Sequence, residues 1–219
     1  SCIPGTLNEE FDSVTPPDLP AGWTTQLVTG QTGDMAWETT VDFYATAPNS
    51  VWTDNPIHVS DKVLLTPKFL GLGGGTVSFW NTYDLEASST PGVAYDGAVL
   101  EIRIGAGDWQ DILAAGGTFI SGGYDHTVAS SFVNPLAGRQ AWSGTVDWIL
   151  TEVTLPASVT NQTIQLRWRV GTDSSTGWTG QAIDSVVLPF CGGFGCAGTP
   201  KTCTALDQCH DIGVCLPET

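Results

Sequence analysis

Apolar and polar side chains alternate along several segments of the chain. Within residues 163–170 the apolar side chains occupy every second position, and polar or charged side chains lie between them. Residues 77–84 and 100–104 show the same period of two. Successive side chains of a β-strand point to opposite faces of the sheet, so this pattern predicts strands with one buried and one exposed face.

Further strands are expected wherever β-branched and aromatic residues cluster between turn residues. These strands are predicted at Asn8–Val14, Ala36–Phe43, Lys62–Phe69, Trp148–Leu155 and Ala182–Leu188. The 26 glycines and 13 prolines interrupt the chain too often for a long helix. We therefore predict an all-β fold, an antiparallel β-sandwich of the jelly-roll type, over residues 1–190. In jelly rolls the first and last strands commonly lie side by side.

Three connections are longer than ordinary hairpin loops: Thr15–Gly33, Ala45–Ser60 and Ala114–Trp142. Long loops on a rigid sandwich often carry binding sites. Five of the nine tryptophans lie in or beside predicted loops: Trp23, Trp37, Trp52, Trp142 and Trp178. Such side chains either stack on sugar rings or plug the ends of the sandwich.

The six cysteines are distributed unevenly, with Cys2 near the start and five others between Cys191 and Cys215. An even number in a dense cluster favours disulfides and an oxidising compartment, although six cysteines allow 15 pairings. Zinc is the alternative, because His210 adjoins Cys209, but no C-x₂-C pair occurs. We interpret residues 191–219 as a second unit, a tail held together by disulfides.

The charge balance excludes several classes of partner. With 23 acidic and 7 basic residues the chain carries a formal charge of −16, which disfavours binding to nucleic acid or to anionic membranes. No apolar run is long enough to span a membrane. The chain shows no secretion signal of its own, so we expect that any such signal has been removed.

No catalytic motif emerges from the residues. There is no G-x-S-x-G elbow, no H-E-x-x-H pair and no phosphate-binding glycine loop, and the chain has only three histidines. A pair of catalytic carboxylates, as in glycoside hydrolysis, remains an alternative, because two such residues can be far apart in sequence and meet only in the folded protein. We predict a protein that is not an enzyme.

Acidic residues on the first and last strands of the predicted sandwich suggest a calcium site. Asp12 lies on the predicted first strand and Asp184 on the predicted last strand, so the fold could bring them together. Two adjacent carboxylates repel each other unless a hard cation joins them, and calcium is the extracellular choice. Asp96 could add a further oxygen, and Asp34 is a weaker candidate. The alternative is that these are solvated turn residues.

Several of the same residues carry a family resemblance. The segments Glu10-Phe11-Asp12 and 16–25 (PPDLPAGWTT) resemble the opening of bacterial cleaved-adhesin and choice-of-anchor modules, which are similar in architecture to MAM domains. Residues 95–102, 134–142 and 183–186 resemble later motifs of that group, in the expected order. The resemblance covers residues 9–190.

The resemblance implies a galactose-binding-like jelly roll of a secreted bacterial protein, often with a structural calcium ion. The family's acidic positions correspond to Asp12 and Asp184. The family often closes with Ile-Asp-Asp, whereas Ser185 stands at the second Asp here. That departure removes one expected metal ligand.

The first functional prediction is a calcium-stabilised, non-catalytic module of an exported bacterial surface protein. It would act extracellularly in adhesion or assembly, with a cell-surface glycan or protein, or copies of itself, as partner. The alternative is a carbohydrate- or substrate-binding accessory domain of a secreted protease or glycanase. The final residues 216–219 (LPET) resemble a sortase signal without its glycine, charged tail or apolar segment.

Overall fold

Two large β-sheets make up the molecule, as shown by a computed structural model that describes residues 2–192. One sheet has seven strands, in the order β11-β14-β7-β16-β4-β3, with β1 also paired to β16. Their bounds are β1 Ile3–Glu9, β3 Glu38–Thr40, β4 Ser50–Asn55, β7 Thr76–Leu85, β11 Thr118–Ser121, β14 Gly144–Thr154 and β16 Trp178–Gly192.

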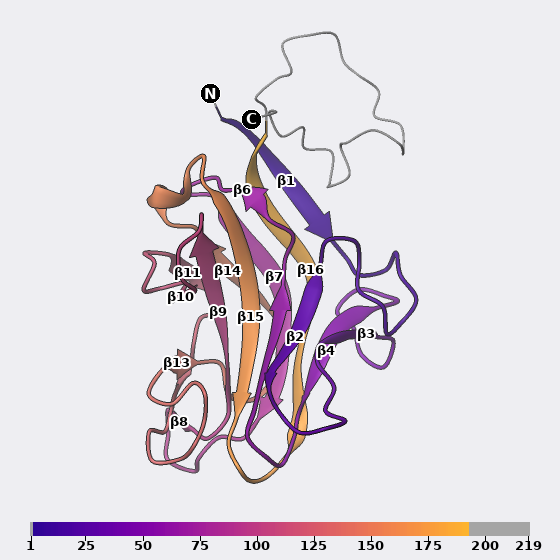
Figure 1. Cartoon of the computed structure of the whole chain (residues 1–219), viewed down its shortest axis with the longest axis vertical. Helices are drawn as coiled ribbons and strands as arrows, with labels where there is room; N and C mark the ends of the chain where they lie inside the picture. The colour runs from indigo at the N-terminus through magenta and orange to yellow at the C-terminus, as the bar shows by residue number, and fades with distance from the viewer. Residues whose placement is uncertain (1, 193–219) are drawn as a thin grey trace.

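The second sheet has six strands, in the order β10-β9-β15-β5-β2, with β6 also paired to β15. Their bounds are β2 Thr24–Thr29, β5 Ser60–Leu65, β6 Phe69–Leu70, β9 Gly97–Ile104, β10 Gln110–Asp111 and β15 Thr163–Thr172. Figure 1 shows β2, β9 and β15 in front of the seven-stranded sheet. A small third sheet joins β8 (Val93–Ala94), β12 (His126–Val128) and β13 (Gln140–Ala141), and residues 157–159 form a short 3₁₀ turn.

The core between the two large sheets contains the inward-facing side chains that the alternation predicted. On β15 the side chains of Ile164, Leu166, Trp168 and Val170 are all buried. Trp168 stacks on Trp23, with ring centroids 6.0 Å apart. The predicted antiparallel β-sandwich is therefore confirmed.

The first and last strands are neighbours, as predicted. β1 pairs with β16 in antiparallel register from Ile3 opposite Gly192 to Glu9 opposite Val186. At the open end of this pair a disulfide joins Cys2 to Cys191. Disulfide formation is thus confirmed for two of the six cysteines. Cys191 belongs to β16, whereas the sequence analysis assigned it to the tail; the other four cysteines, His210 and the 216–219 segment lie outside the described residues.

The predicted first strand, Asn8–Val14, is wrong in its bounds. β1 ends at Glu9, and Phe11 has a positive φ of 60°, a backbone conformation that does not continue a strand. The alternation of Phe11 with Glu10 and Asp12 imitates strand periodicity. Phe11 is nevertheless completely buried, because the turn directs its ring against Trp23.

All three predicted long loops contain strands. Residues 15–33 include β2, residues 45–60 include β4, and residues 114–142 include β11, β12 and β13. β2 is an edge strand that is mostly exposed, so its sequence lacks the apolar alternation of a covered strand. β4 carries polar residues on its buried face, Thr53 and Asn55, and this hid its period of two.

Four arginines gather on the outer face of the six-stranded sheet. Glu101 on β9 is almost completely buried and accepts hydrogen bonds from Arg139, Arg167 and Arg169. Arg103 and Arg167 lie over the ring of Trp109, at 4.7 and 4.3 Å from its centroid. This arginine cluster concentrates most of the described positive charge of an acidic chain on one face.

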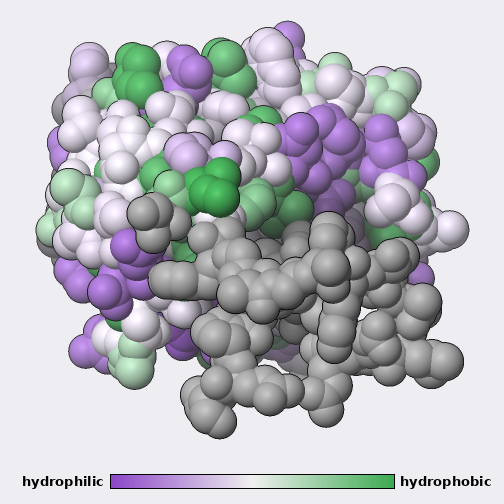
Figure 2. Space-filling model, turned by 90° about the horizontal axis from the view of Figure 1, so that it is seen from above, coloured by the Kyte–Doolittle hydropathy of each residue, from purple (hydrophilic) through white to green (hydrophobic). Residues whose placement is uncertain are grey.

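The end of the molecule that Figure 2 shows mixes polar and apolar residues. In the view from the end that carries the Cys2–Cys191 bridge, hydrophobic residues are interspersed with polar ones outside the grey region (Figure 2). Among residues 2–192 there is no helix of the length and hydrophobicity needed to cross a membrane.

Candidate binding groove

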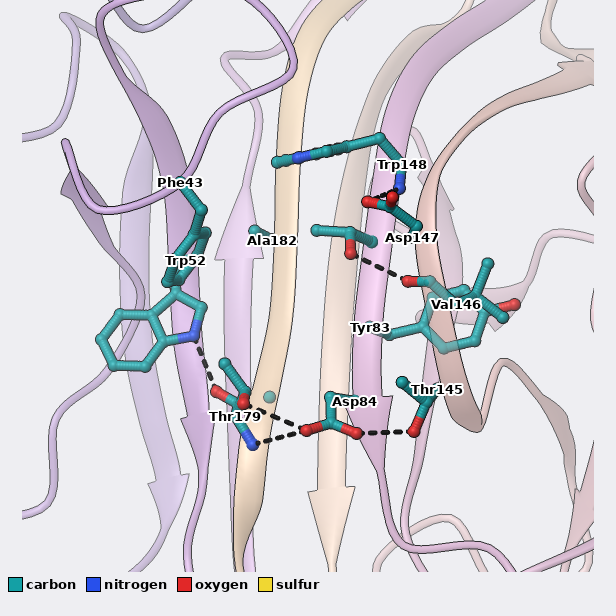
Figure 3. A pocket seen from close by; sticks show the side chains of 12 residues that line it. Phe43, Trp52, Tyr83, Asp84, Thr145, Val146, Asp147, Trp148, Thr179 and Ala182 are labelled. Atoms are coloured by element: carbon teal, nitrogen blue, oxygen red, sulfur yellow. Dashed lines mark hydrogen bonds between the residues drawn. The ribbon is translucent and has the colours of Figure 1, made fainter.

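A shallow groove crosses the outer face of the seven-stranded sheet (Figure 3). Its volume is about 350 Å³, and side chains from β4, β16, β7 and β14 line it. The lining residues are Phe43, Trp52, Thr82, Tyr83, Asp84, Thr145, Val146, Asp147, Trp148, Thr179, Gly180 and Ala182. The groove is therefore built mainly on paired strands, which hold side chains more rigidly than loops do.

The floor is low because the strand in the middle presents almost no side chain. Ala182 and Gly180 of β16 lie between Trp52 on one side and the residues of β7 and β14 on the other. Gly180 has a φ of +103°, and a Cβ atom there would lie 1.9 Å from the carbonyl oxygen of Thr53. No other residue type fits this bulged position without moving β4.

Two half-buried tryptophans form the walls. Trp52 follows the strand geometry of β4, whereas Trp148 lies in a bulge of β14 between Val146 and Ile149, where the register against β7 shifts. In Figure 3 the indole of Trp148 is seen edge-on and that of Trp52 nearly face-on, so the two ring planes are not parallel. The groove thus offers two apolar faces at an angle to each other.

The Trp52 ring is held in place from two sides. Its Nε1 donates a hydrogen bond to the carbonyl oxygen of Thr179 at 2.8 Å, and its ring packs edge to face against Phe43. Two contacts of different kinds fix the ring before any ligand arrives. A preorganised aromatic side chain loses little conformational entropy when it binds.

Asp84 provides the main acceptor at the lower end of the groove. Its Oδ1 accepts a hydrogen bond from Thr145 Oγ1 at 2.7 Å, and its Oδ2 accepts one from Thr179 Oγ1 at 3.0 Å. A second carboxylate, Asp147, lies higher in the groove and is exposed. The lining contains two acidic side chains and no lysine or arginine.

One wall of this groove is predicted in part from the sequence, and the other is not. Trp52 was a candidate, although a loop residue was expected there, while Trp23, Trp37 and Trp142 are core residues that plug the sandwich. Trp178 is exposed but lies outside the groove. Trp148 was predicted as the first residue of a strand. The bulge of β14 directs its indole ring over β16.

Two of the predicted calcium ligands bind the same loop. Asp184 Oδ2 accepts hydrogen bonds from the backbone N–H groups of Ala45 and Thr46, at 2.9 and 2.8 Å. Asp12 Oδ1 accepts one from the N–H of Asn49 at 3.0 Å. Both carboxylates therefore anchor the segment 45–49.

The carboxylate of Asp184 has several donors around it. Its Oδ1 also accepts the N–H of Ser185 at 2.6 Å, and Thr46 Oγ1 lies 3.2 Å from Oδ2. Ser185, at the departure from the family pattern, donates to Glu10 Oε2 at 2.6 Å. Burial raises the pKa of Asp184 although these donors oppose the rise. N–H donors already occupy much of the acceptor capacity that a cation would need.

Asp96 has different neighbours from Asp12 and Asp184. It lies just before β9, completely buried, and its Oδ1 accepts the N–H of Asp173 at 2.7 Å. Asp34, the weaker candidate, is paired with His58 Nε2 at 2.8 Å. Within residues 2–192 no three side chains of histidine, cysteine, aspartate or glutamate are arranged to hold a metal ion by themselves.

Comparisons with known proteins give similarity at the level of structure alone. No family model matches the chain, and no curated protein matches it. One similar solved structure is TmCBM61 in complex with beta-1,4-galactotriose, with 11% identity, a TM-score of 0.45, and coverage of 78% of this chain and 89% of that chain.

Two other similar structures come from different proteins. The K1 cleaved adhesin domain of Lys-gingipain from Porphyromonas gingivalis W83 has 19% identity and a TM-score of 0.46, over 86% of this chain and 99% of that chain. The xylan-binding domain CBM22-1 of Xyn10C from Paenibacillus barcinonensis has 15% identity and a TM-score of 0.42, over 85% and 95%. Cleaved adhesins, the group that the sequence resembles, are thus among the similar structures.

Proposed function

We propose that this chain is a non-catalytic binding module that holds a saccharide in the groove between Trp52 and Trp148. The observation that carries the proposal is the pairing of two ordered aromatic walls with a low floor and a carboxylate. A sugar ring has an apolar C–H face and a rim of hydroxyl groups. Tryptophan rings suit the first, and Asp84 with its flanking threonines suits the second.

The groove favours a neutral sugar. Among its lining residues Asp84 and Asp147 are acidic and none is basic, so a uronate or a sulfated sugar would bring like charges together. Hydroxyl groups, by contrast, donate well to a carboxylate, and hydrogen bonds to charged acceptors are the stronger ones. The alternative function of the sequence analysis, a carbohydrate-binding accessory domain, is therefore preferred to self-assembly.

Removing either wall should abolish most of the binding. Truncation of a central aromatic contact commonly weakens a complex by about 2 kcal/mol or more, which is a factor of roughly 30. We expect Trp52→Ala and Trp148→Ala each to raise the Kd at least about tenfold for an oligosaccharide selected on a neutral-glycan array. Isothermal titration calorimetry measures this change.

Trp178→Ala is the matched control, because Trp178 is an exposed tryptophan on β16 that does not line the groove. It should bind as the wild type does. Equal affinity in all three variants would place the glycan elsewhere. Release of reducing ends from the bound oligosaccharide would overturn the non-catalytic part of the proposal.

Charge selectivity gives an independent prediction. A neutral oligosaccharide and its uronic acid counterpart of equal length should differ at least about tenfold in Kd at low salt, in favour of the neutral one. The double variant Asp84→Asn/Asp147→Asn should narrow that difference, because it removes both charges of the lining. Tighter binding of the uronate by the wild type would contradict the assignment of a neutral ligand.

Adhesion would follow from this binding if the glycan belongs to a cell surface. Self-association into a layer or filament stays a prediction of the sequence analysis. Light scattering of the wild type at several concentrations tests it directly.

A further inference from the structure

The groove is closed on three sides by side chains. Trp52 and Phe43 form the side at β4, and in Figure 3 the indole of Trp148 reaches from β14 over β16 at the upper end. At the lower end a line of hydrogen-bonded side chains runs across four strands (Figure 3). An enclosure of this shape limits how much of a ligand can enter it.

Three neighbouring side chains at the lower end, Thr179, Asp84 and Thr145, form what we call the acceptor row. Thr179 Oγ1 donates to Asp84 Oδ2 at 3.0 Å, and Thr145 Oγ1 donates to Oδ1 at 2.7 Å. A threonine hydroxyl has a single proton, so both hydroxyls present only their lone pairs to a ligand. The row therefore offers hydrogen-bond acceptors on three adjacent strands, β16, β7 and β14.

The space between Trp148 and the acceptor row has room for one sugar unit. The bulge of β14 places Asp147 and Trp148 opposite Thr82 of β7. Asp84 lies two residues further along β7, which is about 7 Å of strand. That length equals about one stacking contact of ~4 Å plus one hydrogen bond of ~2.8 Å. A second sugar unit does not fit between the indole and the row.

The fourth side of the groove, at β14, is open. β11 pairs with β14 only from Glu152 to Thr154, so β14 is the edge of the sheet where Thr145 and Trp148 lie. Thr145 and Asp147 are exposed at this edge. The groove therefore has one mouth, over β14, and ends blindly against Trp52.

We propose that the groove binds the non-reducing terminal unit of a neutral glycan rather than a unit within the chain, an inference that rests on the proposed function. The acceptor row requires several hydroxyl donors along one edge of the sugar. The non-reducing terminal unit keeps every hydroxyl except the anomeric one, whereas an internal unit has lost a further hydroxyl to the next linkage. The remainder of the glycan leaves through the mouth over β14.

Calorimetry with matched short and long ligands tests the inference. The probes are the methyl β-glycosides of galactose, glucose and mannose and the β-1,4-linked trisaccharide of each sugar. For the sugar that binds, the Kd of the methyl glycoside should lie within about threefold of the Kd of the trisaccharide, because one unit makes the contacts. A methyl group on the terminal O4 of the trisaccharide imitates a further unit and should raise the Kd at least about tenfold, because it leaves an acceptor of the row without a donor. Reduction of the opposite end to the alditol should leave the Kd unchanged.

Thr145→Val tests whether the terminal hydroxyls lie at the acceptor row, because it removes one acceptor and keeps the shape of the side chain. It should raise the Kd of the unmodified trisaccharide about fivefold and leave the Kd of the O4-methylated trisaccharide unchanged. Thr154→Val is the matched control, since Thr154 lies at the other end of β14 and does not line the groove. It should bind both ligands as the wild type does.

The outcomes separate this inference from the proposed function. The trisaccharide could bind through the groove, with weaker binding in Trp52→Ala and Trp148→Ala, while the methyl glycoside binds at least about 30-fold more weakly and O4-methylation has no effect. The groove would then hold an internal unit, so the inference would be wrong and the proposed function would stand. If no trisaccharide binds, or if binding is unchanged in both tryptophan variants, the proposed function is wrong and the inference with it.

Discussion

Removal of the Cys2–Cys191 disulfide should lower the free energy of unfolding by about 3–5 kcal/mol, the largest effect that we expect from any single site. The bridge joins residues 189 positions apart, so it closes almost the whole sandwich into one loop. Cross-linking so long a loop restricts the unfolded chain strongly, and the stabilisation grows with loop length. The double variant Cys2→Ser/Cys191→Ser, compared with the wild type by urea unfolding at pH 7, measures the difference.

The double variant is preferable to a single one, because a lone Cys191 could exchange with cysteines of the tail. The serine replacements themselves change only local hydrogen bonds and packing around residues 2 and 191, which should alter the free energy of unfolding by about 1 kcal/mol. An unfolding free energy within 1 kcal/mol of the wild type would show that β1 holds to β16 without the bridge.

Replacing Glu101 with glutamine should lower the free energy of unfolding by about 3 kcal/mol. Glu101 is buried among Arg139, Arg167 and Arg169, and its loss leaves three guanidinium groups without their shared carboxylate. Breaking one partner out of a buried ion pair commonly costs about 3–5 kcal/mol. The value belongs at the lower end of that range, because the arginine side chains retain 14–25% exposure and so are partly screened by water.

The effect of Glu101→Gln should depend on pH with a definite sign. Burial alone would raise the pKa of Glu101, but the hydrogen bond from Arg139 and the charges of the three arginines lower it overall. A carboxyl with a lowered native pKa stabilises the fold above its unfolded value of about 4.3 and loses that contribution as pH falls through the native pKa. The two proteins should therefore differ fully at pH 7 and converge in acid.

Glu38→Gln on β3 is the matched control, a glutamate without an ion pair among the described contacts. Its free energy of unfolding should equal that of the wild type at pH 7 and at pH 3. A constant difference between Glu101→Gln and wild type down to pH 3 would mean that shape, rather than charge, accounts for the loss.

The sandwich could be predicted from sequence because its core strands obey a simple rule. On β15 every second residue is apolar, and every one of those side chains is buried. The rule failed where a strand buries polar groups, as at Thr53 and Asn55, or where a strand lies at an edge, as β2 does. In both places the pattern of apolar residues no longer reports the pattern of burial.

The groove was harder to predict because bulges create it. Trp148 reaches over β16 because the register of β14 against β7 shifts between Val146 and Ile149. No residue type in that segment predicts the shift. Gly180 is the one visible trace, a glycine inside a strand that marks a bulge or a close backbone approach.

The pairing of β1 with β16 also determines how the domain would carry mechanical load. If flanking segments pull in opposite directions at Cys2 and Cys191, the tension passes from one to the other through the sulfur–sulfur bond. The strands between those two residues then bear no force, and the sheets keep their shape while the chain on either side is stretched. A sandwich built in this way can hold a ligand in its groove under a pull that would shear an unbridged pair of terminal strands apart.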